Sequence, residues 1–447
     1  MYHVILLLVA IVFIVLATTK LKWHPFLALL IAAFGFGLLS GMDPQQVVKS
    51  VNDGFGGTIG YIGIVILCGT IIGTFLERSG GAQSLAESTL RLTGQKNVPL
   101  AMGLVGYVVS LPVFCDSGFV LLSPLNRALS KKAGISLAAG AVALSLGLYA
   151  THTMVPPTPG PIAAAGILEA DLGRVILWGM VVSAVALLAG WIFAVRVAAR
   201  YQISADAGAK DQAEAPEAPP TDRPNTGLAV LPILLPIVLI VLQSIAKYPS
   251  KPFGEGAFVD WLVFVGQPVV ALMIGTFLSF TLPRRFEAAL LSGSGWVGKA
   301  ILAAAPIIVI TGSGGAFGKV LQNSGIADTI GDAMAGANLG IWLPFLIAAG
   351  IKSAQGSSTV AIITTAGIVA PLLGALGLDG ETAKALVVVA IGAGSMVVSH
   401  ANDSYFWVVT QFSGMNVRDG YKLQTLGTLI EGLAAALGVW VLSLILL

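Results

Sequence analysis

Two stretches of this chain resemble each other at a separation of 245 residues, and both lie within apolar segments long enough to cross a membrane. Residues 69–82 and 314–327 are identical at six of fourteen positions. The polar motif that follows each copy also corresponds, because residues 115–118 align with residues 355–358. A duplicated set of apolar segments, interrupted by polar residues at matching places, predicts two similar membrane-embedded halves and is typical of a transporter.

The composition defines the fold class. Hydrophobic residues make up 56% of the chain and charged residues only 10%, which is far from the composition of soluble globular proteins. Many apolar runs have the ~20 residues that a helix needs to cross a bilayer, and the short alternating segments of a β-barrel are absent. We therefore predict an all-α polytopic membrane protein. The first apolar run, 4–17, lacks a basic leader and a small-residue cleavage site, so we expect a retained span.

Several other functions are excluded by the residue pattern. The net charge of +2 comes from scattered basic residues, so no nucleic-acid surface is expected. Cys68 and Cys115 lie in apolar surroundings and indicate neither a disulfide framework nor a metal site. The glycine-rich run 312–318 lacks the βαβ context of a dinucleotide site, and no zinc spacing, phosphate loop or nucleophile elbow is present. We predict no metal, no cofactor, no catalytic residue and no enzymatic activity.

A hydrophilic stretch of proline, alanine and acidic residues at 201–226 has no apolar face to bury and predicts a flexible linker. It separates an N-terminal membrane repeat, 1–200, from a C-terminal membrane repeat, 227–447. The predicted apolar spans are 4–19, 25–40, 59–76, 136–167, 175–199, 228–246, 259–282, 300–321, 383–411 and 426–447.

Two further apolar regions, 98–129 and 341–376, are interrupted midway and do not fit two full crossings. About a dozen residues follow Asp116 in the first region, so its return arm covers only ~18 Å of a ~30 Å hydrocarbon core. Each region is therefore predicted to be a re-entrant hairpin. Non-helical backbone at that depth is tolerated inside protein or beside a water-filled cavity, which makes both tips candidate sites.

The distribution of basic residues tests this layout. With the N-terminus outside and both regions as hairpins, seventeen of the 24 lysine and arginine residues fall on one side, which the positive-inside rule assigns to the cytoplasm. The linker is then cytoplasmic. Residue 69 lies on a span that runs inward and residue 314 on one that runs outward, so the layout predicts an inverted repeat of about five spans plus one hairpin each.

The first hairpin tip combines helix breakers with a carboxylate. Pro112 and Gly118 interrupt the helix, while Asp116 and Ser117 supply a carboxylate and a hydroxyl. A charge at the bilayer centre costs about 2.5 to 3.5 kcal/mol on insertion scales, so such a group usually faces a cavity and has a function. Asp116 is the first candidate proton carrier. The alternative is that Asp116 caps the returning helix.

The second hairpin tip is rich in hydroxyl groups. Gly356 permits the turn, and Ser357, Ser358 and Thr359 begin the next half-helix. The amides and hydroxyls of such a helix start form an anion site without a metal. Lys352 precedes the tip by about one and a half turns, where its amine can neutralise a substrate carboxylate. The alternative is that Lys352 extends to the interface or pairs with a buried acid.

Two of the long spans are also predicted to be broken near the midplane. Four prolines and a glycine in 152–161 prevent a regular helix, which frees backbone groups for a ligand; a simple kink is the alternative. The neighbouring side chains His152, Thr153 and Thr158 add donors and acceptors.

The corresponding segment of the other half, 399–404, places five polar side chains in an apolar span. His400 is a candidate proton relay, while Asn402, Asp403 and Ser404 can hydrogen-bond the hydroxyl groups of a ligand. The alternative is a polar network that only holds the helices together.

Four segments, in the same order and at similar spacing, resemble the gluconate permease family of proton symporters: SLPVFCDSGFVLLSPLNRALSKK, HTMVPPTPGPIAAAGIL, AQGSSTVAIITTAG and SHANDSYFW. The resemblance covers nearly the whole chain. It implies proton-coupled uptake of gluconate or a related small sugar-acid anion across the bacterial inner membrane. Relatives carry idonate, glycerate or D-serine, so these substrates stay open.

The family is similar to the larger ion transporter superfamily, which implies an elevator-type mechanism in which hairpins and broken helices slide against a dimeric scaffold. A homodimer is therefore expected. We expect the proton sites to be Asp116 and Asp403 first, with His152 and His400 next, and the sequence does not decide among them. A sodium-coupled carboxylate transporter, a membrane-embedded hydrolase and a passive channel are the rival functions.

Overall fold

The structure, a computed structural model, describes residues 2–93, 97–204, 223–247, 251–325, 339–400 and 403–447. Within these ranges the chain forms α-helices with short 3₁₀ and π segments, and no strand is found. The predicted all-α class is confirmed. Asn402 and most of the predicted linker lie outside the described residues.

The helices of the first half follow the predicted apolar segments. Proline at the first helical positions and side-chain caps such as Asp43 and Asp171 define several of their starts. The elements are α1 (Tyr2–Thr19), α2 (Pro25–Leu39), α3 (Pro44–Arg78), α4 (Gly81–Thr93), α5 (Val98–Val109), α6 (Cys115–Ala133), α7 (Leu137–Met154), α8 (Pro159–Ile167), α9 (Leu172–Arg196) and η1 (Ala198–Arg200).

The second half has a similar sequence of long helices and broken pairs. Its elements are α10 (Thr226–Ala246), α11 (Ala257–Val265), α12 (Pro268–Ser279), η2 (Ala288–Leu291), α13 (Trp296–Asn323), α15 (Trp342–Gln355), α16 (Ser358–Val369), η3 (Ala370–Leu372), α17 (Glu381–Met396), α18 (Ser404–Phe412), α19 (Val417–Gly420), η4 (Tyr421–Thr425) and α20 (Leu426–Leu446). All four predicted interruptions separate two helices: α5 from α6, α7 from α8, α15 from α16, and α17 from α18.

Helix α3 is longer than the predicted span 59–76. It has 35 residues and bends by 43° between Tyr61 and Gly63. Its first part buries Val47, Val51 and Gly54 while most of the residues between them are exposed, which is the periodicity of an amphipathic helix. Such a segment has too many polar residues to register as a membrane span.

Two other elements differ from the sequence expectation. The amphipathic helix α4 was not predicted. The span predicted at 259–282 consists of α11 and α12, which meet at 67°. Gly266 lies at this bend, where a Cβ atom would be 2.3 Å from the Gln243 side chain, and Pro268 opens α12. Together they break the helix because Gly266 permits the close approach and Pro268 cannot continue the previous turn.

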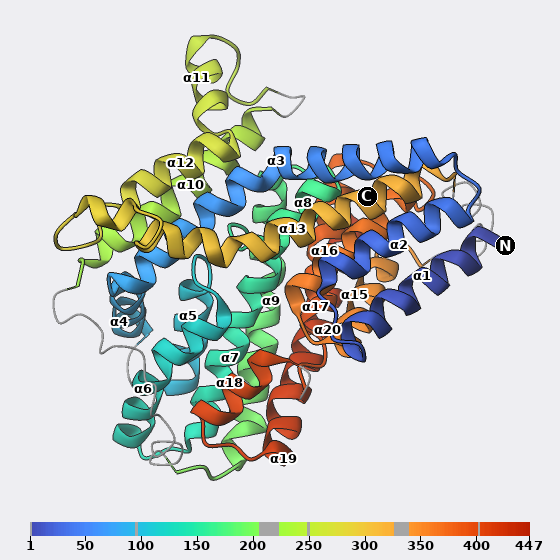
Figure 1. Cartoon of the computed structure of the whole chain (residues 1–447). Coiled ribbons are helices and arrows are strands. Elements are labelled where there is room, and N and C mark those ends of the chain that lie inside the picture. Colours follow the sequence, from blue (N-terminus) through green and yellow to red (C-terminus); the bar gives the residue numbers. More distant parts are fainter. Residues whose placement is uncertain (1, 94–96, 205–222, 248–250, 326–338, 401–402) are drawn as a thin grey trace.

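Helices α3 and α13 run side by side across the molecule, and the broken helices lie to one side of them (Figure 1). Their contact is close because it passes through glycine. A Cβ atom on Gly54 would lie 2.5 Å from the carbonyl oxygen of Gly315, and one on Gly315 would lie 2.0 Å from Thr58 Oγ1. Small residues at such positions are the usual way in which membrane helices approach each other.

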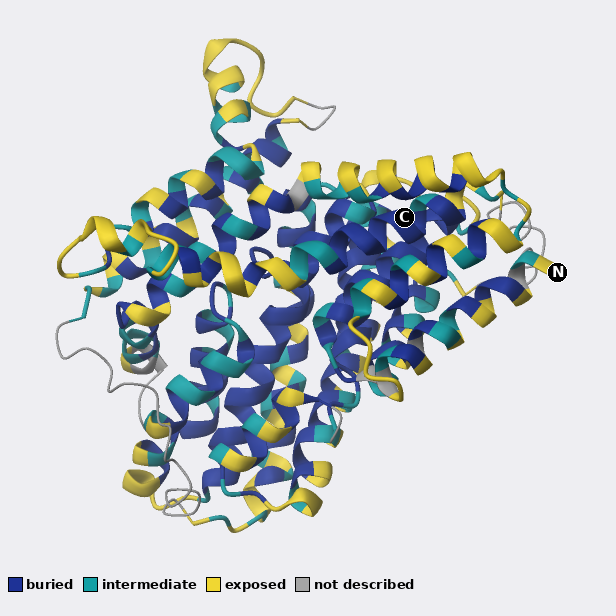
Figure 2. Cartoon of the chain, in the orientation of Figure 1, coloured by how far each residue is buried: buried dark blue, intermediate teal, exposed yellow. Residues whose placement is uncertain are grey.

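Helix α7 occupies the centre and is buried along its whole length (Figure 2). Its alanine and glycine residues allow neighbouring helices to approach: a Cβ atom on Gly147 would lie 2.1 Å from the carbonyl oxygen of Gly103 on α5. The outer surface instead exposes large apolar side chains such as Leu302 and Ile445, as expected for helices that face lipid.

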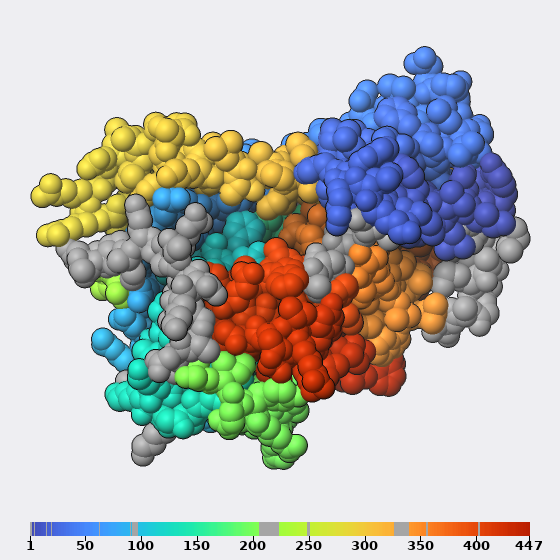
Figure 3. Space-filling view, turned by 60° about the horizontal axis from the view of Figure 1, so that its bottom comes forward, coloured from blue at the N-terminus to red at the C-terminus, as the bar shows by residue number. Residues whose placement is uncertain are grey.

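The two halves interleave in space. In the space-filling view the C-terminal segment (red) lies between first-half segments (cyan and green) and the orange segments of the second half (Figure 3). Contacts of α17 with α7 and of α20 with α9 agree with this view. In the described part of the chain, five helical segments are long and apolar enough to cross a membrane, or up to seven if each bent pair is one span.

Candidate transport site

The first break, between α5 and α6, contains an acidic side chain that is only partly hydrogen-bonded. The Ser110 hydroxyl donates to the Val113 carbonyl at 3.1 Å, which stabilises the turn. Asp116 lies in the first turn of α6, but the N-cap residue is Phe114 and no side chain caps this helix. Asp116 Oδ1 is buried and has no hydrogen-bond partner among the described residues. The carboxyl group is therefore not used as a helix cap.

The first broken span, α7 and α8, is buried throughout. The hydroxyls of Thr153 and Thr158 donate to backbone carbonyls of the same span, at 3.1 and 2.6 Å. His152 Nδ1 has no partner in the described part of the chain. The His152 ring lies 5.9 Å from the ring of Phe114. His152 is thus next to the first tip, whereas both threonine hydroxyls are engaged locally.

The second break, between α15 and α16, is stabilised by residues of its own tip. Gly356 has a φ of 92°, a conformation that glycine adopts without strain. The Ser357 hydroxyl caps α16 by accepting from a backbone amide at 3.3 Å. The Lys352 ammonium group donates to the carbonyl of Gly356. The predicted turn glycine is confirmed, and Ser358 and Thr359 form the first turn of α16.

The second broken span accepts hydrogen bonds from, and donates them to, residues of η4 and α20. Val398, a β-branched residue, has a φ of 57°, which is uncommon for this residue type. The amide of Ser399 donates to Thr428 Oγ1 at 3.1 Å, and its carbonyl accepts from Thr425 Oγ1 at 2.6 Å. His400 Nε2 lies 2.8 Å from a backbone carbonyl oxygen of α15. Ser399 and His400 at the start of the unwound segment are therefore held by hydrogen bonds to neighbouring elements.

An ion pair joins the second tip to the second broken span. Lys352 Nζ lies 2.6 Å from Asp403 Oδ2, and these side chains are only 0% and 6% exposed. The Asp403 carboxylate also accepts from the Ser399 hydroxyl at 2.5 Å and from the Tyr405 amide at 3.1 Å. The Tyr149 ring centroid is 5.7 Å from Lys352 Nζ. Of the arrangements considered for Lys352, the structure contains the one in which it pairs with a buried acid.

The first tip lies close to this ion pair. Both charges of the pair, and the side chain of Ser404, are near enough to interact with the Asp116 carboxyl. The start of α8 also meets the start of α16, because a Cβ atom on Gly160 would lie 3.9 Å from the Cα atom of Thr359. The four breaks therefore converge in space, although they are distributed over both halves of the sequence.

The predicted ligand-binding hydroxyls differ in their exposure. Ser117 is half-buried, Ser358 is buried and Ser404 is exposed. Gly118 serves close packing, since a Cβ atom there would lie 2.7 Å from a methyl carbon of Leu148. The charged groups of the ion pair are thus adjacent, whereas these hydroxyls differ in their access to solvent.

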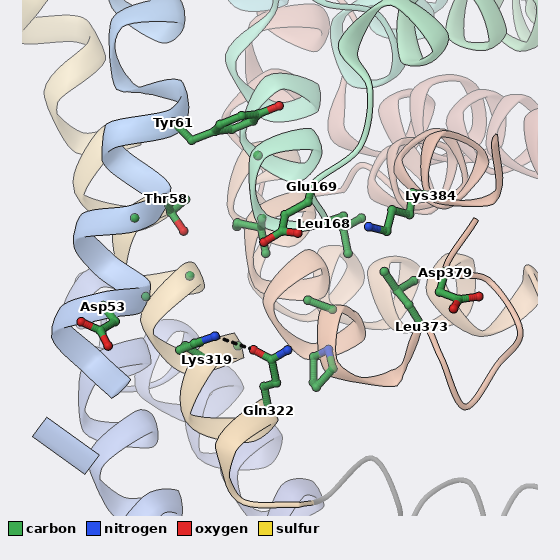
Figure 4. Close-up of a pocket in the computed structure, with 18 of the residues that line it drawn as sticks. Asp53, Thr58, Tyr61, Leu168, Glu169, Lys319, Gln322, Leu373, Asp379 and Lys384 are labelled. Carbon is green, nitrogen blue, oxygen red and sulfur yellow. Dashed lines mark hydrogen bonds between the residues drawn. The ribbon is translucent and has the colours of Figure 1, made fainter. Parts of the chain in front are cut away.

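A cavity of about 650 Å³ lies between α3 and α13 on one side and α8, η3 and α17 on the other (Figure 4). Its charged lining residues are Asp53, Glu169, Lys319, Asp379 and Lys384. In Figure 4 the lysine Lys319 bonds to Gln322 on the same helix, and Glu169 extends into the space between the two walls. None of the predicted site residues lines this cavity.

A much smaller cavity, of about 10 Å³, lies at the first tip itself. It is lined by Gly69 and Thr70 of α3, by 112–114 and by 157–159. This volume is close to the minimum for one water molecule. The first tip and the first broken span are therefore packed closely against α3 in this conformation.

Sequence reasoning missed a second group of buried polar residues. The Tyr405 hydroxyl donates to the Ser145 carbonyl at 2.9 Å, and the Ser145 hydroxyl donates to Gln424 Oε1 at 2.8 Å. Glu431 is also buried, on α20. A signal for Glu431 was present, because it is the one acidic residue of the apolar segment 426–446. The rule that identified Asp116 applies to it equally.

Comparison with known proteins identifies the family of this chain. The model of the GntP family permease matches residues 2–445. A gluconate permease of Pseudomonas aeruginosa is 36% identical over 445 residues, covering 98% of this chain and 97% of the relative. The D-serine transporter DsdX of Escherichia coli is 33% identical over 449 residues, covering 98% of each chain. These relatives are permeases and transporters, not enzymes.

Solved structures support the fold. The YdaH transporter of Alcanivorax borkumensis matches with a TM-score of 0.65 at 16% identity, covering 94% of this chain and 98% of the other. MtrF of Neisseria gonorrhoeae matches with a TM-score of 0.61 at 13% identity, covering 95% and 96%. Both are helical transporters. The apolar helices, the broken spans and the full-length match together show that this chain is a multi-pass protein of the bacterial inner membrane and belongs to the GntP family of permeases.

Proposed function

We propose that this permease takes up gluconate, or a related small sugar-acid anion, together with protons. The observation that carries the proposal is the convergence of four helix breaks on the buried Lys352–Asp403 pair, beside the incompletely bonded carboxyl of Asp116. Buried charges among membrane helices usually mark the path of a substrate or an ion. The 36% identity to a gluconate permease supports the substrate class.

The second tip supports recognition of an anion. Helix α16 begins at Ser358 with its amides directed toward the tip, and the start of a helix favours negative charge. Lys352 lies beside it, because its ammonium group donates to the carbonyl of Gly356. In this proposal a substrate carboxylate binds at the start of α16 near Lys352, and nearby hydroxyls bind its polyol chain.

Proton coupling is assigned first to Asp116. The Asp403 carboxylate accepts from Lys352, Ser399 and Tyr405, so its charge is balanced where it lies. Asp116 lacks a cation of its own and has an oxygen without a partner among the described residues. A carboxyl in that state is better suited to bind and release a proton. His152 and His400 are kept as secondary candidates.

The transport movement is proposed to follow the elevator scheme, with the two hairpins re-entrant and the two halves, 1–200 and 227–447, related as an inverted repeat joined by the cytoplasmic linker 201–226. Both hairpins and both broken spans then move together against α3, α13 and their neighbours, and two copies form a homodimer. The proton and the anion together stabilise the mobile state, so a half-loaded site moves poorly.

The test is uptake of labelled gluconate into proteoliposomes that contain the purified protein. Accumulation driven by an inside-alkaline pH gradient without sodium is expected. Accumulation only with a sodium gradient would favour the sodium-coupled alternative, and equilibration without accumulation would indicate a channel. Recovery of unchanged gluconate inside excludes hydrolysis.

D-serine is the second candidate substrate, because DsdX of Escherichia coli is 33% identical to this chain over its length. Competition by unlabelled gluconate, idonate, glycerate and D-serine distinguishes the substrates. A zwitterion needs a partner for its amine as well as for its carboxylate, so strong competition by D-serine alone would contradict the sugar-acid proposal.

A further inference from the structure

Glu431 is a buried acid outside the site described above. It lies on α20 and is 0% exposed. Neither of its carboxyl oxygens has a hydrogen-bond partner among the described residues. An unpaired charge in such surroundings is strongly unfavourable, so the neutral form with a bound proton is the stable one. A structural role alone does not require an acid at this position.

The carboxyl group lies between α20 and α9. A Cβ atom built on Gly190 of α9 would be 3.4 Å from Glu431 Oε1, and it would also meet Leu146 of α7. The restrictive contact is with Leu146, at 2.9 Å, so Gly190 allows α7 to approach α9, and the carboxyl group of Glu431 lies beside Gly190 at an ordinary contact distance.

The surroundings of Glu431 offer it no neutralising charge. The elements packed against α20 are α9, α17, α7, α15 and η4. Their titratable groups, with Tyr405 of α18, are Arg174, Arg196, Glu381, Lys384, Tyr149, His152, Lys352, Tyr421, Lys422 and Tyr405. In the described part of the chain, none of these groups forms a hydrogen bond with either carboxyl oxygen of Glu431.

The helix that carries Glu431 also holds the second broken span. Thr428, one turn before Glu431, accepts from the Ser399 amide at 3.1 Å, and Thr425 donates to the Ser399 carbonyl at 2.6 Å. Ser399 in turn donates to Asp403 at 2.5 Å. A shift of α20 therefore acts on the ion pair of the candidate site through these hydrogen bonds.

A second series of hydrogen bonds connects the segment before α20 with the second broken span. Gln424 lies in η4, the segment directly before α20, seven residues before Glu431. Its Oε1 atom accepts from the Ser145 hydroxyl at 2.8 Å, and the Ser145 carbonyl accepts from Tyr405 at 2.9 Å. The Gln424 Nε2 atom has no partner among the described residues. The segment that includes it, η4, is a π-helix, a feature frequent at functional sites.

We infer that Glu431 is a second proton-binding site of the transport cycle, which couples protonation to the position of the second broken span. The inference rests on the proposed proton-coupled function. A proton from water on one side of the membrane forms an O–H bond with the carboxylate, and that bond breaks when the proton passes to water on the other side. No other reactant is needed.

The test compares wild-type protein with Glu431→Gln in proteoliposomes, with Glu381→Gln as the matched control on an exposed residue of α17. Glu431→Gln should keep gluconate counterflow at equal pH on both sides and lose accumulation driven by a pH gradient. The infrared band of a protonated carboxyl that changes during turnover should also disappear. The control should match the wild type in each measurement.

The outcomes separate the two proposals. If wild-type protein does not accumulate substrate under a pH gradient, the proposed function is wrong. If the wild type accumulates it and Glu431→Gln does so equally, only the inference about Glu431 is wrong. Should Glu431→Gln not fold, Glu431→Asp decides: a displaced dependence of uptake on external pH with unchanged counterflow supports the inference, and an unchanged pH dependence overturns it.

Discussion

Lys352 Nζ lies 2.6 Å from Asp403 Oδ2 where neither side chain reaches solvent, so each charge depends on the other. Lys352→Met or Asp403→Asn leaves a buried charge or donor without its partner. Removal of one member of a buried pair costs about 3 to 5 kcal/mol. We expect each single variant to lower the free energy of unfolding by this order, as measured in detergent by chemical or thermal denaturation.

The double variant is the control for this prediction. Lys352→Met combined with Asp403→Asn removes both charges, so it should recover much of the stability lost by either change. We expect no gluconate uptake by the double variant. If the double variant is as unstable as the sum of the single variants, the two side chains do not depend on each other.

Asp116→Asn tests the proposed proton carrier. The amide keeps the shape of the carboxyl group but cannot bind and release a proton at physiological pH. Accumulation driven by a pH gradient should be abolished, while exchange of labelled for unlabelled gluconate should continue. Asp260→Asn, on an exposed residue of α11, should behave as the wild type. Normal accumulation by Asp116→Asn would remove Asp116 from this role.

The glycine face of α3 predicts an effect on transport rate. A Cβ atom on Gly73 would lie 2.2 Å from the carbonyl oxygen of Pro112 at the first tip. Gly73→Ala should therefore disfavour the conformation in which the first tip packs against α3 by about 1 to 3 kcal/mol. We expect this to change the initial rate of uptake. Gly60→Ala, on the same helix but with nothing within 4 Å, is the matched control. Equal rates in both variants would argue against a mechanism that needs this contact.

Membrane orientation is tested by labelling of introduced cysteines. Cys68 and Cys115 are buried, so a thiol at an exposed position reports on its own side. In right-side-out vesicles, Lys49→Cys should react with an impermeant maleimide and Arg418→Cys should react only after permeabilisation, because the basic side is cytoplasmic. The reverse pattern would invert the predicted layout.

The breaks in the helices were predictable from the sequence because their cause is local. Proline cannot continue a helix, and glycine adopts backbone conformations that other residues avoid. An observed break lies at Pro112, at the prolines of 152–161 and at Gly356. The amphipathic start of α3 escaped prediction because its polar face lowers the mean hydropathy of the window.

The partners of the polar side chains were not predictable from one sequence. Lys352 and Asp403 are 51 residues apart in the sequence. The residues around Asp403 and Asp116 do not show which of the two carboxylates pairs with Lys352. The choice depends on how α15 and the second broken span pack together. For the same reason Ser399 did not stand out, although its backbone groups form hydrogen bonds with Thr425 and Thr428 at the start of the unwound segment.

Lys352 donates both to Asp403 and to the carbonyl of Gly356, the residue that turns its own tip. One amine thus stabilises the turn of the second hairpin and also binds this hairpin to the neighbouring broken span. A substrate carboxylate that reaches this amine competes either with the Gly356 carbonyl or with the Asp403 carboxylate. Binding of the substrate and weakening of the contacts that hold the second hairpin then occur in a single step.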